Sequence, residues 1–157
     1  MADITRGFLI DAAEITKGAL LNGTVSAGDP IGQDGTGWVR ADADSVSCQA
    51  FAMADGISGD RISICGKALY QTTTTLTQGN MIWLSATAGR LADADPGSAT
   101  AMSHVLGWVV GTSPSGLIQL NANIPHVEAT FTISLATLVI AGQFINFFIA
   151  KIGRAHV

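Results

Sequence analysis

One segment of about twenty residues occurs twice in this chain. The copies begin at Val25 and Leu76 and align without a gap at a constant shift of 51 residues. Both contain a Gly-Asp or Gly-Asn pair near the start and end in Ala-Asp-Ala-Asp. Self-similarity at a fixed period is typical of a structural unit that is used twice. We therefore expect an internal duplication, with related units over about residues 25–64 and 76–120.

Each copy has the pattern of short strands joined by tight turns. Gly28-Asp29 and Gly79-Asn80 open the copies, and these residue types tolerate the left-handed backbone conformations of tight turns. A strand is expected directly after each pair. Further apolar runs predict additional strands at residues 50–54, 61–64, 105–110 and 117–120.

The composition disfavours helices. The chain of 157 residues contains 18 glycines, and glycine costs roughly 0.5–1 kcal/mol in a helix interior. Ser, Thr and Asp are also frequent, and they compete for the backbone hydrogen bonds of a helix. The sequence therefore predicts an all-β fold, a small β-barrel or β-sandwich of roughly eight to ten strands over residues 18–124, built from the duplication.

The two ends of the chain differ from this pattern. Residues 1–17 are expected to form an N-terminal arm or a first strand. In residues 125–150, Thr and Ser alternate with apolar residues at a period of two, which favours a β-hairpin that starts a second, truncated β domain. A membrane-spanning segment is the alternative, because residues 131–150 are long enough to cross a bilayer. Residues 151–157 resemble the translation of a sequencing adapter, so we expect a non-native tail.

Charge and cysteine content restrict the partners. Only 13% of the residues are charged, against about 25% in average proteins, which predicts that part of the surface is covered in an assembly. The net charge is −4 and the eight basic residues are scattered; nucleic-acid binding, which depends on Lys and Arg, is not expected. Cys48 and Cys65 are expected to be small buried residues of a cytosolically made protein, with a single disulfide as the alternative.

No combination of residues predicts catalysis. An active site needs a nucleophile, a base and a group that orients the base, and no such set is recognisable. The three histidines, His104, His126 and His156, have no metal-ligand spacing, and the first two are expected in exposed loops. We therefore expect no catalytic residue, no cofactor and no enzymatic activity.

The Asp-x-Asp pairs are the one repeated acidic feature. Asp42 and Asp44 recur as Asp93 and Asp95. Carboxylates at alternate loop positions are calcium ligands in other proteins, but Asp in a turn also accepts hydrogen bonds from its own backbone. The further oxygen ligands of a calcium loop are only partly present, so the turn is favoured over a metal site.

Four aromatic residues are candidates for contacts. Trp38, next to a turn, is expected to be exposed, and with Tyr70 it is a candidate for a subunit interface or for stacking on a sugar ligand. Trp83 and Trp108 lie in apolar runs and are expected in the core or in a subunit interface.

Several of these segments together resemble a known protein family. They are Gly18-Ala19-Leu20-Leu21, Ala27-Gly28-Asp29, Trp38-Val39, Ala41-Asp42-Ala43-Asp44, Leu84-Ser85-Ala86-Thr87-Ala88-Gly89 and Val105-Leu106-Gly107-Trp108-Val109. This set resembles a β module of tailed-bacteriophage structural proteins, among them capsid decoration (cement) proteins and segments of head and tail fibres. The resemblance covers most of residues 18–123 and does not extend to residues 125–150.

The resemblance implies a virion protein, made in the host cytoplasm, that acts without an active site. Such modules assemble as symmetric homo-oligomers, often trimers, and bind the major capsid protein or other virion proteins. A cement protein stabilises the capsid because it binds only the assembled state, through many symmetric contacts. The alternative is a carbohydrate-binding or adhesion module of the tail-fibre type, in which Trp38 and Tyr70 stack on sugars.

Overall fold

The structure is a computed structural model that describes residues 2–97, 103–112 and 116–124. These residues contain nine strands and no helix, which confirms the predicted all-β fold. All the strands belong to one curled antiparallel sheet with the form of a half-barrel. The strands are β1 (Phe8–Leu20), β2 (Pro30–Gln33), β3 (Trp38–Arg40), β4 (Ala50–Ala52), β5 (Arg61–Gln71), β6 (Met81–Leu84), β7 (Leu91–Ala92), β8 (Val105–Gly111) and β9 (Leu117–Asn121).

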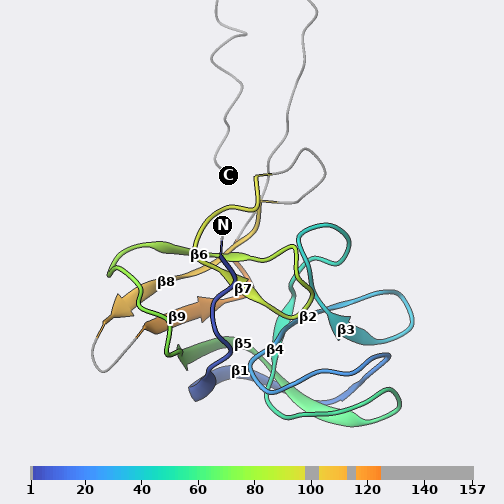
Figure 1. The fold of residues 1–157 in the computed structure, drawn as a ribbon. Coiled ribbons are helices and arrows are strands. Elements are labelled where there is room, and N and C mark those ends of the chain that lie inside the picture. The colour runs from blue at the N-terminus through green and yellow to red at the C-terminus, as the bar shows by residue number, and fades with distance from the viewer. Residues whose placement is uncertain (1, 98–102, 113–115, 125–157) are drawn as a thin grey trace, which may run out of the picture. The chain divides into compact units, whose positions relative to one another are not determined.

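The order of the strands is symmetric about the centre of the sheet. It is β3-β2-β4-β5-β9-β8-β6-β7, with β1 added on β5 (Figure 1). The central ladder pairs β5 with β9, from Lys67 opposite Asn121 to Gln71 opposite Leu117. Outward from this central pair, the strand order is β4, β2, β3 in one half and β8, β6, β7 in the other. β2 and β3 therefore occupy the places that β6 and β7 have in the second half. The two similar segments thus take equivalent places in the sheet, while their origin by duplication stays a prediction.

The apolar side chains form two cores, a larger one with residues from both halves of the sheet and a smaller one within the first half. The larger core includes Phe51, Tyr70 and Leu106, and the smaller includes Ile31 and Ile64. β4 lies between them, because Phe51 belongs to the larger core while Ala50 and Ala52 belong to the smaller. All three residues of β4 are therefore buried.

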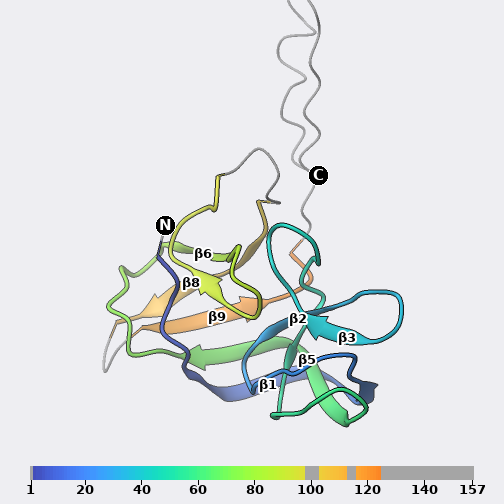
Figure 2. The same ribbon diagram turned by 45° about the vertical axis from the view of Figure 1, so that its right-hand side comes forward.

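The N-terminal residues connect the two halves. Ile4 donates its N–H to the Leu91 carbonyl at 2.8 Å, beside a bridge between Asp3 and Ala92 on β7. The chain then runs across the sheet to β1 (Figures 1 and 2). Beyond β1, Leu21 forms a parallel bridge with Trp38 on β3. One stretch of chain thus meets the last strand of each half. The N-terminal arm or first strand was expected to end at residue 17, whereas β1 extends to Leu20.

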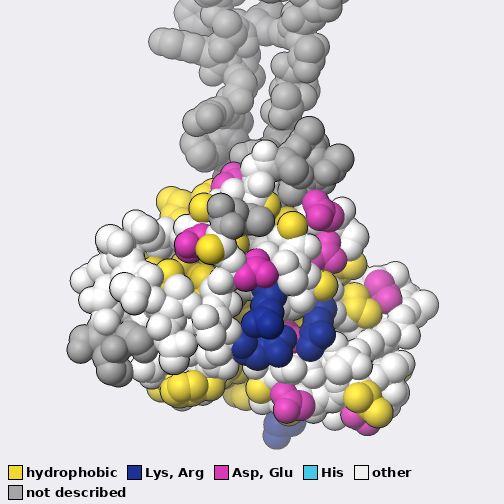
Figure 3. Space-filling model, viewed as in Figure 1, with side chains coloured by type: hydrophobic (Ala, Val, Ile, Leu, Met, Phe, Trp, Pro, Cys, Tyr) yellow, Lys and Arg dark blue, Asp and Glu magenta, His cyan; other side chains and the backbone are white. Residues whose placement is uncertain are grey.

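A buried carboxylate ties this N-terminal stretch to the first half. Asp29 is 1% exposed; its carboxylate forms an ion pair with Arg6 at 2.8 Å and accepts the Arg40 Nε–H at 2.7 Å. Basic side chains gather near the middle of one face of the molecule (Figure 3). A buried charge is stable only when it is paired and hydrogen-bonded. Arg6 and Arg40 are the partners that make the burial of the Asp29 carboxylate possible.

The predicted hairpin or membrane segment of residues 125–150 and the predicted non-native tail lie outside the described residues. Among the residues that are described, no helix is long and apolar enough to cross a membrane.

Candidate functional site

Two of the Asp-x-Asp carboxylates, Asp42 and Asp95, accept N–H groups of their own turns in the structure. The Asp42 carboxylate accepts the N–H groups of Asp44 at 2.9 Å and Ser45 at 2.7 Å. Asp93 accepts the N–H of Ala2 at 3.0 Å, and Asp95 accepts the N–H of Gly97 at 3.1 Å and the Ser103 hydroxyl. In the described part of the chain no three His, Cys, Asp or Glu side chains lie close enough to hold a metal ion. Asp42 and Asp95 thus have the geometry of a turn acceptor, whereas Asp93 accepts from the distant N-terminal stretch.

Tyr70 lies in the larger core. Its side chain is 3% exposed, and its hydroxyl accepts the N–H of Gly7. Burial raises the pKa of this phenol above its usual value. A sugar ring cannot stack on a buried aromatic face, so Tyr70 does not belong to an exposed platform with Trp38. The period of two in Ala68 and Tyr70, both buried, is the sequence signal that indicates this orientation.

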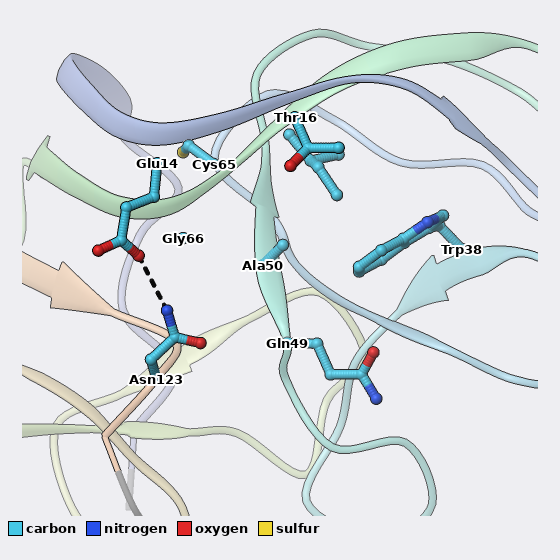
Figure 4. A pocket seen from close by; sticks show the side chains of 9 residues that line it. Glu14, Thr16, Trp38, Gln49, Ala50, Cys65, Gly66 and Asn123 are labelled. Atoms are coloured by element: carbon cyan, nitrogen blue, oxygen red, sulfur yellow. Dashed lines mark hydrogen bonds between the residues drawn. The ribbon is translucent and has the colours of Figure 1, made fainter.

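Trp38 forms one wall of a shallow depression of about 290 Å³ (Figure 4). Residues of four strands and of the segments next to them contribute to it, because β1 and β3 both curl toward β4 and β5. We call it the Trp38 depression. Its lining residues are Glu14, Thr16, Trp38, Gln49, Ala50, Ile64, Cys65, Gly66 and Asn123.

Glu14 reaches this depression through an unusual backbone conformation. Among the described residues it is the one non-glycine residue with a positive φ, at 58°. Its carboxylate pairs with the Lys67 ammonium at 2.6 Å and accepts the Asn123 side-chain amide at 2.9 Å. The hydrogen bond from Lys67 is the main reason why the pKa of Glu14 lies below its usual value. A left-handed backbone costs a residue with a Cβ roughly 1–2 kcal/mol, so the surrounding contacts hold Glu14 in place.

Glu14, Gln49 and Asn123 had no signal in the sequence. They come from β1, from the residue before β4 and from the residues after β9, and only the folded sheet brings them together. A glutamate in a left-handed conformation inside a strand is imposed by tertiary contacts, because its local sequence does not favour it.

Trp83 and Trp108 lie on the outside of the sheet. Met81 is opposite Trp108, and Trp83 is opposite Val105, across the β6–β8 pair. Trp108 is 44% exposed and Met81 is 57% exposed, while Trp83 and Val105 are half-buried. Trp108 is predicted to lie in the core or in a subunit interface. Its exposure shows that it does not lie in the core. We call these four residues the outer apolar face.

The strands that carry the outer apolar face have no charged residue. β6, β8 and their neighbour β9 contain no Asp, Glu, Lys, Arg or His. Charged side chains are depleted and Trp and Met are enriched at the centre of protein interfaces. The face therefore has the composition of a subunit contact.

β1 is a second exposed apolar element. It pairs with β5 along one side, and among the described residues no strand pairs along its other side. Four large apolar residues on it are 40–59% exposed: Phe8, Ile10, Ile15 and Leu20. A long edge strand with unpaired backbone groups and exposed apolar side chains is a place where another chain can add a strand.

The described histidine and the two cysteines are buried. His104 is 7% exposed, so its expected place in an exposed loop is wrong. Its carbonyl accepts the Leu84 N–H at 2.8 Å, which holds it against β6 at the start of β8. Cys48 and Cys65 are buried thiols without a disulfide, as expected. His126 and His156 lie outside the residues that the structure describes.

No family model matches this chain, and no curated protein matches it.

Proposed function

We propose that this chain is a structural component of a bacteriophage virion, which decorates and stabilises the capsid or forms part of a head fibre. The proposal rests on the resemblance of its repeated segments to that class of module, and on two exposed surfaces suited to assembly. It requires no catalysis, and it places the chain in the virion as a homo-oligomer bound to the major capsid protein.

The outer apolar face is the single observation that carries the proposal. A second copy of the chain is the occupant we assign to it. Because the strands β6, β8 and β9 carry no charge, two such faces bring no like charges together when copies associate. Trp108 and Met81 are neighbours across two strands, so they form one contact area in place of scattered exposed residues.

The free side of β1 is the surface we assign to the capsid protein. Strand addition to a sheet edge uses backbone hydrogen bonds for affinity and side chains for specificity. β1 offers both along its 13 residues, which two register shifts, at Leu9/Asp11 and Thr16/Ala19, divide into shorter stretches. A homo-oligomer would carry one such edge per copy, so that weak single contacts add up to tight binding on an assembled shell.

The alternative function, a carbohydrate-binding module with Trp38 and Tyr70 as a stacking platform, has less support. One of the two aromatic residues is buried in the core. An extended sugar platform needs at least a second exposed ring beside Trp38, and Tyr70 does not supply it.

Sequencing of the flanking DNA and a binding assay test the proposal. The gene is expected beside genes for a portal, a prohead protease and a major capsid protein. That capsid protein, assembled into shells, is then sedimented with the full chain, which should bind at a fixed ratio to capsid subunits. Ile10→Lys on β1 should reduce the bound amount at least tenfold.

Ile57→Lys is the matched control, because Ile57 is also exposed (61%) and lies in the turn between β4 and β5, off both surfaces. It should bind like the wild type. Metabolic or secretory neighbours of the gene, or a chain that stays in the supernatant with intact shells, would refute the virion role.

A further inference from the structure

The Trp38 depression lies where the first half of the sheet curls back on itself. Leu21, at the end of β1, bridges Trp38 on β3, and Asn22 donates its N–H to the Trp38 carbonyl at 2.9 Å. β1, β5, β4, β2 and β3 thus surround the smaller core, and the depression opens beside it. Mouths of curled sheets and barrels are preferred places for small ligands.

The depression combines one apolar wall with a polar rim. The indole of Trp38 points toward Ala50 from one end of the depression, with Gln49 on the same side, while Glu14 and Asn123 lie together at the other end (Figure 4). Amide groups both donate and accept hydrogen bonds, and a carboxylate accepts them. A sugar ring has complementary chemistry, because its faces carry C–H groups and its edge carries hydroxyl groups.

The charges of the depression favour a neutral ligand. Glu14 is the one acidic residue that lines it, and no basic residue does. The Glu14 carboxylate is paired with Lys67 at 2.6 Å. An anionic ligand such as a phosphate would meet no unpaired cation there, and a cationic ligand would have to compete with Lys67 for the carboxylate.

The size and the single aromatic wall restrict the ligand further. The volume of about 290 Å³ is close to the lower limit of about 300 Å³ for small-molecule sites. Proline-rich peptides bind grooves lined by several aromatic residues, and here Trp38 is the one aromatic residue in the lining.

Glu14 gives an independent reason to regard the depression as a built site. A non-glycine residue in a left-handed conformation persists only where its surroundings hold it, and such residues cluster at ligand sites. Here the strained residue supplies a rim carboxylate whose oxygens are oriented by Lys67 and Asn123.

We propose that the Trp38 depression binds one or two rings of a neutral saccharide, with the sugar face against Trp38 and its hydroxyl groups on Glu14, Gln49 and Asn123. The site goes beyond the assembly role. It shares no residue with the outer apolar face, whereas Glu14 and Thr16 belong to β1, the strand assigned to the capsid protein.

The test uses tryptophan fluorescence of the full chain carrying Trp83→Phe and Trp108→Phe, in which Trp38 is the one tryptophan left. The probes are glucose, galactose, N-acetylglucosamine and their β-1,4-linked disaccharides. At least one should shift the Trp38 emission with a dissociation constant on the order of 1 mM. Calorimetry on the wild type should give the same constant, which shows that Trp83 and Trp108 take no part.

Gln49→Ala and Asn123→Ala are the informative variants, because both side chains are exposed and their loss leaves the cores intact. Each should weaken binding about tenfold, and Thr87→Ala, away from the depression, should not. The proposal is overturned if no probe changes the emission of the folded protein, if the response survives both rim substitutions, or if a proline-rich peptide binds in place of the sugars. Gln49 and Asn123 lie outside β1, so Gln49→Ala and Asn123→Ala should bind capsid shells like the wild type, and the two proposals fail separately.

Discussion

Gly28 and Gly79 have the same left-handed backbone conformation, with φ of +86° in both. Each donates its N–H across to a neighbouring strand, Gly28 to the Ala52 carbonyl at 2.7 Å and Gly79 to the Val109 carbonyl at 2.8 Å. The repeated Gly-Asp or Gly-Asn pair thus produces one turn geometry twice. The surroundings differ, because a Cβ on Gly28 would lie 2.8 Å from Tyr70 Cε2, whereas a Cβ on Gly79 would meet nothing within 4 Å.

Alanine at the two glycines should therefore have unequal effects on stability. Gly79→Ala should cost about 1 kcal/mol for the left-handed backbone alone. Gly28→Ala should cost about 1–3 kcal/mol more, because Tyr70 in the larger core must shift. Urea denaturation of both variants measures the difference, and equal costs would show that Tyr70 does not pack on Gly28 as described.

Asp29 and Asn80 are a second pair at matching positions with different burial. Asp29→Ala should destabilise the chain by about 1–3 kcal/mol, because the Arg6 and Arg40 guanidinium groups, each about a third exposed, lose their shared partner. Asn80→Ala changes an exposed side chain and should cost no more than about 0.5 kcal/mol. Denaturation midpoints test this, and a small effect of Asp29→Ala would mean that the two ion pairs contribute little.

The sequence predicted the turns and strands better than the faces of the strands. Gly28 and Gly79 are local signals, since a tight turn depends on a few adjacent residues. In β6, by contrast, Met-Ile-Trp-Leu is apolar throughout, and a continuous apolar run does not show which side faces the core. The sequence therefore predicts the core or an interface for Trp83 and Trp108, and it does not distinguish between the two.

The site residues depended on contacts that are distant in sequence. Trp38 was predicted to be exposed, and it is half-buried at the edge of a depression. Its partners Glu14 and Asn123 are 109 residues apart, and no local pattern relates them. The role of the first residues in joining both halves was equally hidden, because it depends on where β3 and β7 lie in the sheet.

The backbone strain at Glu14 predicts a difference between two small substitutions. Glu14→Ala and Glu14→Gly both remove the carboxylate, but only glycine adopts a positive φ without cost. The glycine variant should be more stable than the alanine variant by about 1 kcal/mol. Thermal denaturation measures the difference. If alanine proves equal or better, Glu14 is not held in the left-handed conformation.

The buried thiols predict a dependence on alkaline pH. Burial raises the pKa of Cys48 to about 12 and that of Cys65 to about 11. Groups with raised pKa values stabilise the folded state fully below their unfolded pKa, near 9, and this contribution is lost as the pH rises toward 12. Cys48→Ala should therefore lose less stability than the wild type over this range.

The reactivity of the thiols is a second test of the burial of Cys48 and Cys65. An aromatic disulfide reagent at pH 8 should not modify Cys48 or Cys65 in the folded chain, and should modify both in denaturant, because the thiolate is the reactive form. Rapid modification without denaturant would contradict their burial.

The central claim is that the chain assembles through its outer apolar face, and sedimentation velocity tests it most directly. The unsubstituted chain should sediment as a defined homo-oligomer. Trp108→Lys, which places a charge in the middle of that face, should sediment as a monomer, while Ile57→Lys should keep the oligomer. A wild type that is monomeric at every concentration, or an oligomer that persists in Trp108→Lys, would contradict the account.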